Sequence, residues 1–170
     1  MSFDKPEKMN FDASSYAFGI AVARFNRELT DALLDDVLAT LTCAGVSTDN
    51  IKVVRVPGSG ELPHMCNLMA TTNEFDAVIA LGVVIAGETP HHQIIGDSTA
   101  LALQSVACSA GIPVINGIVV TNDRAQAEMR TIGGIRRGVE FGEAALEMAW
   151  ITDAFLAEYD DGDDFNYDGK

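Results

Sequence analysis

Short apolar stretches alternate with longer amphipathic ones through most of the 170-residue chain. The short stretches are apolar on both faces rather than at every second position. This pattern is typical of strands buried inside a parallel sheet. We predict strands at residues 17–23, 51–56, 76–85 and 113–120.

The stretches between these strands have apolar residues at helical spacing. We predict helices over residues 27–44, 63–72, 91–110 and 137–156, and a short helix that is capped by Asn122 or Asp123 and ends near residue 131. The clearest apolar stripe lies in the first of these helices, where the residues recur every four positions. They are Leu29, Leu33, Val37 and Leu41.

Alternation of strands and helices predicts an α/β protein, a three-layer α/β/α sandwich built on a four-stranded parallel sheet with right-handed crossovers. In such sheets, ligands bind at the carboxyl ends of the strands. Three unusual segments follow predicted strands, at residues 24–26, 57–61 and 87–91. We therefore expect them to meet at one edge of the sheet.

Composition favours one globular domain, because 48% of the residues are hydrophobic and only 21% are charged. We expect a flexible N-terminal segment at 1–14, a domain at 15–157 and an acidic tail at 158–170. No apolar run approaches the ~18 residues of a membrane span. The polar start of the chain lacks the apolar core of a signal peptide, which predicts a cytoplasmic protein.

The formal net charge is −14, and residues 158–170 contribute six acidic side chains against one lysine. Binding to nucleic acid or to an anionic membrane is therefore not expected, since both need cationic surface. The three cysteines, Cys43, Cys66 and Cys108, have neither a C-x-x-C pair nor the Cys/His spacing of a zinc site. We interpret them as buried, reduced thiols and expect no metal.

The most informative segment is GVVIAGETPHH, at residues 82–92. Its β-branched run ends at Gly87 and passes into a histidine pair at the start of a predicted helix. A helix N-terminus favours an anion, and His91 beside it would be placed to transfer protons. The alternative is a helix start without a ligand. His92, about 100° around the helix, is interpreted as structural.

Two further segments have both a structural and a functional interpretation. Phe25 is either an aromatic residue at the edge of the core or a flat surface on which a planar ring stacks. The glycines of GSGE bring backbone N–H groups close to a ligand or simply form a turn. Glu61 either holds a polar substrate or stabilises the first turn of a helix.

An anionic substrate would need local positive groups on so acidic a chain. Arg130, Arg136 and Arg137 are the candidate phosphate ligands, since arginine binds phosphate in bidentate fashion. The alternative is surface pairing with Glu128 or Glu140.

Several of these segments together resemble the 6,7-dimethyl-8-ribityllumazine synthases, transferases of riboflavin biosynthesis with a flavodoxin-like fold. The resemblance covers roughly residues 15–150. The matching stretches are ARFNRELTDALL, VVRVPGSGELP, FDAVIALGVVIAGETPHH, GIPVINGIVVTNDRAQAEMR and GEAALEMA.

The resemblance implies condensation of 5-amino-6-ribitylaminouracil with 3,4-dihydroxy-2-butanone 4-phosphate, with loss of phosphate and water and without a cofactor. It also implies roles by position. His91 would transfer protons. Phe25, Ser59, Gly60, Glu61, Val83, Val84, Ile85 and Asn116 would bind the uracil substrate, and Gly87, Glu88, Thr89 and Arg130 would hold the phosphate.

The resemblance further implies a homopentamer whose sites lie between subunits, with a 60-subunit icosahedral shell left open. Asn116 and Arg130 would come from the neighbouring subunit. The chain departs from many relatives at Gly60, Ala86, Asn116 and residues 92–94, and in a shorter loop at 131–137. Two alternatives therefore stand beside an active enzyme: a non-catalytic flavin- or lumazine-binding relative, and a structural shell protein.

Overall fold

The structure, a computed structural model, describes residues 11–160. Most of the predicted N-terminal segment and acidic tail therefore lies outside the described residues. At the described start, Ala13 is buried and its N–H donates to the carbonyl of Ala44 at 3.0 Å. None of the described helices has the length and hydropathy needed to cross a bilayer.

Four parallel strands form a single sheet in the order β2-β1-β3-β4. The predicted fold class is confirmed, and each strand boundary lies within one residue of its prediction. The strands are β1 (Phe18–Ala23), β2 (Ile51–Val56), β3 (Ala77–Ile85) and β4 (Val114–Thr121).

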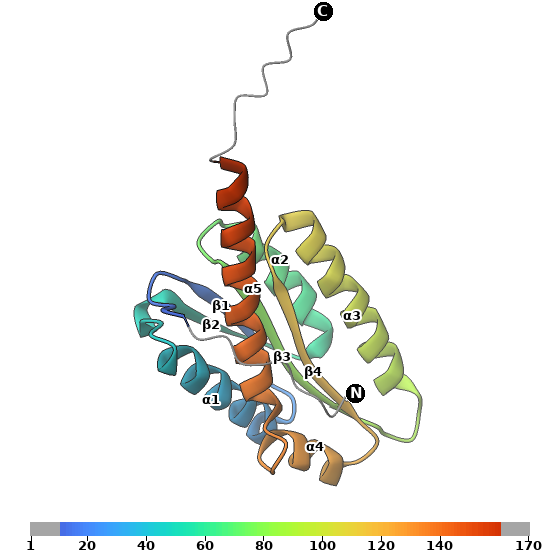
Figure 1. The fold of residues 1–170 in the computed structure, drawn as a ribbon. Helices are drawn as coiled ribbons and strands as arrows, with labels where there is room; N and C mark the ends of the chain where they lie inside the picture. The colour runs from blue at the N-terminus through green and yellow to red at the C-terminus, as the bar shows by residue number, and fades with distance from the viewer. Residues whose placement is uncertain (1–10, 161–170) are drawn as a thin grey trace, which may run out of the picture.

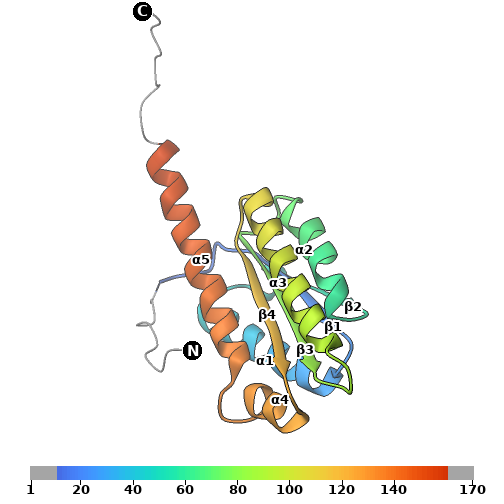
Figure 2. The ribbon, with the colours of Figure 1, turned by 90° about the vertical axis from the view of Figure 1, so that its right-hand side faces the viewer.

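Helices cover both faces of the sheet (Figure 1). Figure 2 shows the sheet nearly edge-on, with α5 on one side and α2 and α3 on the other. The fifth helix ends four residues later than predicted and continues beyond the edge of the sheet. The helices are α1 (Arg27–Cys43), α2 (Leu62–Ala70), α3 (His91–Ala110), α4 (Arg124–Thr131) and α5 (Arg137–Asp160).

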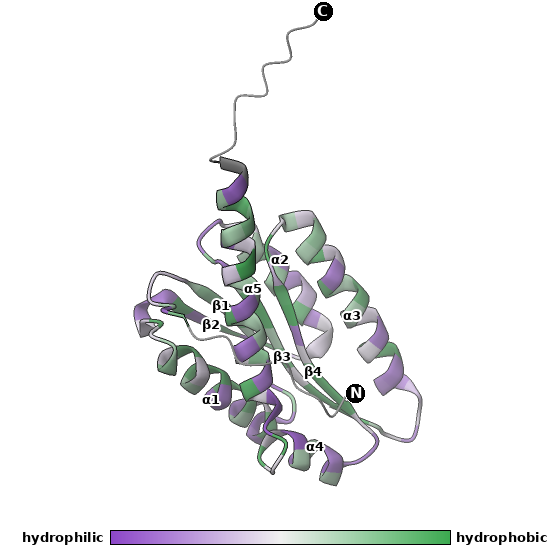
Figure 3. Cartoon of the chain, in the orientation of Figure 1, coloured by the Kyte–Doolittle hydropathy of each residue, from purple (hydrophilic) through white to green (hydrophobic). Residues whose placement is uncertain are grey.

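Two apolar clusters hold these layers together, one on each face of the sheet. The predicted stripe of α1 is confirmed, since Leu29, Leu33, Val37 and Leu41 are all fully buried. Full burial of one such side chain contributes about 1.5–3 kcal/mol to the stability of the fold. The central strands β1 and β3 are hydrophobic along most of their length (Figure 3). The outer strands β2 and β4 are only partly buried, because each has a neighbour on one side alone.

The prediction of three buried thiols is right for Cys66 and wrong for Cys43 and Cys108, which are exposed in the single chain. Apolar neighbours in the sequence do not decide which side of a helix a cysteine occupies. Cys43 is the last residue of α1, and Cys108 lies on the outer face of α3.

Candidate active site

The candidate site lies at the carboxyl edge of the sheet, where β1 and β3 are neighbours. The helices that follow these two strands pack on opposite faces, so their loops diverge at this edge, which is where open parallel sheets bind ligands. Asn26 joins the loop after β1 to strand β3, because its side-chain amide donates to the carbonyl of Val83 at 2.9 Å. Its left-handed backbone (φ 53°) is a conformation that asparagine tolerates better than most residues. No role for Asn26 was predicted, although its position between a predicted strand and a predicted helix was a signal.

Phe25 presents its ring to solvent beside the next loop. Its exposed fraction is 71%, which excludes the core-edge interpretation for the single chain. A Cβ atom on Gly58 would lie 3.2 Å from the ring of Phe25 and 3.3 Å from the carboxylate of Glu61. Arg24, Phe25 and Pro57 line a hollow of about 390 Å³. The predicted stacking surface is therefore open and adjoins the GSGE turn.

The GSGE turn forms a short 3-10 helix, Ser59–Glu61, that leads into α2. The Glu61 carboxylate accepts the Gly58 N–H at 2.8 Å, so its structural role is real, while the side chain as a whole stays exposed. Gly60 faces open space, because nothing lies within 4 Å of a Cβ atom placed there. Ser59 is buried against Gly82 of β3 and supports the turn rather than forming its outer surface.

The end of β3 leads into the loop before α3. Val83 is buried, whereas Val84 and Ile85 are half-buried and present backbone groups near the edge. The carbonyl of Val83 is already occupied by the Asn26 amide, and the Ala86 N–H donates to the Thr121 carbonyl at 2.8 Å. Val84 and Ile85 are in register with Val120 and Thr121 of β4, so the backbone groups open to a ligand here are those that point away from β4.

The N-terminus of α3 has the features of an anion site. Residues 87–90 are exposed, and no side chain caps the helix at Pro90. The Gln93 N–H donates to the Pro90 carbonyl at 3.0 Å, so the backbone N–H groups that precede it and the positive end of the helix dipole are left for an anion. His91 is exposed at this tip. His92 is half-buried with its Nδ1 3.4 Å from the Thr89 carbonyl, in agreement with its structural interpretation.

The three arginines proposed as phosphate ligands differ in the contacts that they make. Arg136 pairs with the buried Asp36, and Arg137 pairs with Glu140. The surface-pairing alternative is thus confirmed for Arg137, while the partner of Arg136 was not anticipated. Arg130 is half-buried and donates to its own helix, at the Gln126 carbonyl (3.0 Å). Its guanidinium has no carboxylate partner among residues 11–160, which leaves charge available for an anion.

Asn116 does not join this cluster within one chain. It pairs in register with Ala80, five residues before the end of β3. At about 3.3 Å per residue, this places it about 16 Å below the edge where the loops meet. Asn116 lies on the open side of β4 and is exposed. The hydrogen bond of Arg130, on α4, is likewise to Gln126 of its own helix and not to the loop at 87–91.

The buried cysteine is a poor nucleophile, and the described residues form no cluster that could hold a metal ion. Burial raises the pKa of the Cys66 thiol to about 12, so this thiol stays protonated at neutral pH. Within residues 11–160, no three His, Cys, Asp or Glu side chains lie close enough to hold a metal ion.

An open parallel sheet with helices on both faces, and a hollow beside Phe25 at the carboxyl edge of the sheet, define an α/β protein of the flavodoxin-like type. A family model for 6,7-dimethyl-8-ribityllumazine synthase matches residues 15–153. The chain belongs to this family.

Named members of the family align over most of this chain. The Xylella fastidiosa 6,7-dimethyl-8-ribityllumazine synthase is 42% identical over 137 residues, which cover 80% of this chain and 89% of that protein. The Yersinia pestis enzyme is 46% identical over 75% of this chain and 81% of its own length. The Polaromonas sp. enzyme is 36% identical over 88% and 96%, respectively.

Proposed function

We propose that the chain condenses 5-amino-6-ribitylaminouracil with 3,4-dihydroxy-2-butanone 4-phosphate to give 6,7-dimethyl-8-ribityllumazine. Family membership over residues 15–153 supports this reaction. The observation that carries it is the juxtaposition of an exposed aromatic ring, a glycine turn and an uncapped helix tip along one edge of the sheet. A planar, polyhydroxylated substrate and a phosphate need these three kinds of surface.

The uracil substrate would lie along the β1 and β2 loops. Phe25 stacks on its ring, Gly60 and Glu61 contact the ribityl chain with Ser59 supporting their turn, and the backbone of residues 83–85 meets the uracil edge. The exposure of Phe25 and the open space above Gly60 support this arrangement. Stacking of two aromatic rings contributes about 0.5–1.5 kcal/mol to the binding free energy, in addition to the contribution from buried apolar surface.

The phosphate would lie at the tip of α3, against Gly87, Glu88 and Thr89. The aryl amine attacks the C2 ketone, and water is lost to give an imine. Removal of the C3 proton then expels phosphate from C4, and the resulting enol becomes a ketone at C3. The ribitylamino nitrogen attacks that ketone with loss of a second water, which closes the ring. His91 transfers protons in these steps, and Arg130 of a neighbouring subunit stabilises the departing phosphate. Much of the acceleration comes from holding two substrates in reacting order.

The working form would be a cytoplasmic homopentamer, with a 60-subunit shell as a further possible assembly. Support comes from α3, where Thr99 and Leu103 are the buried residues while Ile94 and Leu101 are 60% and 67% exposed. Val120 and Asn116 add exposed surface on β4. A second copy of the chain would cover this surface and bring Asn116 and Arg130 to the site. Light scattering should give five subunits or a multiple of five, and a stable monomer would contradict the assembly.

The test of function is to mix the purified protein with both substrates and to follow the lumazine chromophore. The proposal predicts formation well above the uncatalysed rate. Saturable binding of riboflavin without turnover would instead favour a non-catalytic flavin-binding relative, and neither binding nor turnover would leave a structural shell protein.

Replacing His91 with alanine should lower kcat about 10²-fold, the lower end of the range for general acid–base catalysis. Both substrates would still be bound in reacting order, so their KM values should change little. Steady-state kinetics with each substrate varied in turn measures this. His64→Ala, an exposed histidine on α2, is the matched control and should keep full activity. An unchanged kcat in His91→Ala would remove the proton-transfer role.

A further inference from the structure

Helix α4, which ends with Arg130 in its last turn, is weakly anchored by packing. It has eight residues, and its buried side chains are those of Ala127 and Thr131, both small. Helices of this length are marginal unless tertiary contacts hold them. The direction of α4 therefore depends on polar contacts.

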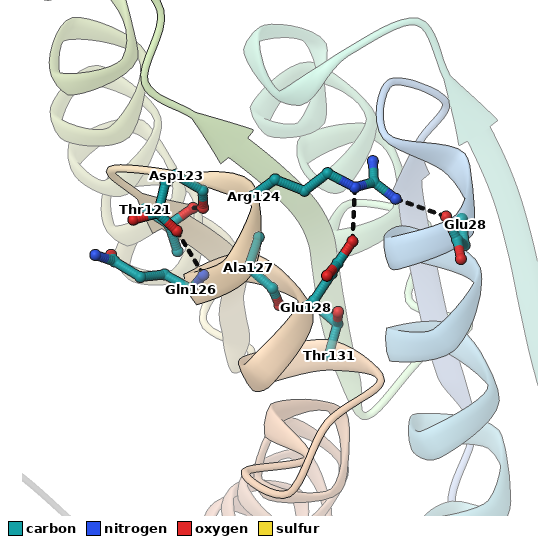
Figure 4. Close-up of polar contacts among 8 residues, drawn as sticks. All are labelled: Glu28, Thr121, Asp123, Arg124, Gln126, Ala127, Glu128 and Thr131. Atoms are coloured by element: carbon teal, nitrogen blue, oxygen red, sulfur yellow. Dashed lines mark hydrogen bonds and ion pairs between the residues drawn. The ribbon is translucent and has the colours of Figure 1, made fainter.

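Arg124 makes two such contacts at the start of α4 (Figure 4). Its Nη2 donates to Glu28 Oε2 at 2.8 Å, and its Nε donates to Glu128 Oε1 at 2.6 Å. Glu28 lies in the first turn of α1, three residues after Phe25, whereas Glu128 lies one turn further along α4. One guanidinium thus joins the two helices.

A chain of hydrogen bonds continues from this end of α4 to Arg130. The Asp123 carboxylate caps the helix by accepting the Gln126 N–H at 2.7 Å. The side-chain oxygen of Gln126 accepts the Asn122 N–H at 3.3 Å. The backbone carbonyl of Gln126 accepts an N–H from Arg130 Nη1 at 3.0 Å. The guanidinium of Arg130 is therefore fixed to the backbone of α4 and moves with it.

We propose that Arg124 is a positioning residue that sets the place of Arg130 by clamping α4 to the first turn of α1. This inference rests on the proposed phosphate role of Arg130. At 1.5 Å per residue, Arg130 lies about 9 Å along the helix from Arg124, so a small tilt at Arg124 becomes a shift on the order of 1 Å at Arg130. A displacement of that size weakens the contact between the Arg130 guanidinium and the phosphate of the bound substrate.

The clamp predicts a selective kinetic change in Arg124→Met, which keeps the length of the side chain and removes its charge. KM for the butanone phosphate should rise about tenfold, while KM for the uracil substrate and kcat stay within about twofold. Glu28→Gln should act in the same direction. The matched control is Arg27→Met, which removes a still more exposed charge (78% against 56% for Arg124) whose ion pair among residues 11–160 lies within α1, with Asp31. It should leave both KM values unchanged.

Salt provides a second readout, because Arg124 and Glu28 are both largely exposed. Screening should weaken the clamp of the unaltered protein, so its KM for the phosphate substrate should approach that of Arg124→Met in about 1 M salt. If KM for the phosphate substrate still differed tenfold between the unaltered protein and Arg124→Met at high salt, this would contradict an ionic clamp. So would a rise in both KM values together, which indicates general damage to the fold.

Two measurements without turnover separate this inference from the proposed function. Hydrogen exchange over residues 124–131 should be faster in Arg124→Met than in the unaltered protein, and the affinity for inorganic phosphate, measured by calorimetry, should fall. Unchanged exchange would overturn the clamp, and faster exchange with unchanged phosphate affinity would overturn its positioning role. Failure of the unaltered protein to form lumazine or to bind phosphate would instead overturn the proposed function, and the positioning role with it.

Discussion

Replacing Arg130 with alanine should lower kcat/KM for 3,4-dihydroxy-2-butanone 4-phosphate roughly 10³-fold, the effect of losing a charged partner to a bound anion at about 2–5 kcal/mol. The guanidinium of Arg130 is half-buried and has no carboxylate partner among residues 11–160. Its charge is therefore available to a phosphate, whereas the charges of Arg136 and Arg137 are neutralised by Asp36 and Glu140.

The selectivity of this loss is the informative result. Steady-state kinetics should show a large rise in KM for the phosphate substrate and a small change for the uracil. Arg130→Lys should recover part of the loss, because lysine keeps the charge but not the bidentate geometry. Arg27→Ala, which removes a charge from exposed surface, should match the unaltered protein. Equal weakening of both substrates by Arg130→Ala would contradict the phosphate role.

Replacing Gly117 with alanine should destabilise the fold by about 3 kcal/mol, the upper part of the range for overpacking a tight interior. Gly117 lies in β4 opposite Leu81 of β3. A Cβ atom there would lie 2.7 Å from the Ala80 carbonyl oxygen, 2.7 Å from Leu81 Cδ2 and 3.0 Å from Phe141 Cδ2. Because one of these neighbours is backbone, relief requires β3 and β4 to move apart.

Thermal unfolding at fixed protein concentration measures this effect. For a chain of this size, 3 kcal/mol corresponds to a fall in Tm of about 6–12 °C. Gly134→Ala is the matched control, since nothing lies within 4 Å of a Cβ atom at that position, and its Tm should stay within about 2 °C. A Gly117→Ala protein as stable as this control would show that the β3–β4 contact is looser than the structure places it.

Much of the fold could be predicted because local patterns and sheet geometry agree. The four-residue recurrence of Leu29 through Leu41 places one face of α1 against the sheet, and all four residues are fully buried. Parallel strands bring their carboxyl ends to one edge, so three segments distant in sequence could be expected together. Gly58 lies beside the Phe25 ring and the Glu61 carboxylate, so the first two of these segments do meet.

Local sequence patterns could not predict the side-chain pairings between distant elements. Arg136 meets Asp36 across α1 and the loop before α5, a separation of 100 residues that no local spacing encodes. The clamp of Arg124 on Glu28 spans 96 residues and has the same cause. Exposure of Cys108 and Leu101 on α3 could not be predicted from composition, since an apolar helix face is compatible with burial by its own chain or by another copy.

The central claim is that a phosphate binds at the tip of α3 beside an imidazole. A crystal structure of the assembled protein with inorganic phosphate and a lumazine analogue tests it most directly. The account predicts phosphate on the backbone N–H groups near residues 87–91, with His91 and Arg130 of a neighbouring subunit within reach and the analogue stacked on Phe25. Phosphate bound elsewhere, or a helix tip covered by protein, would contradict it.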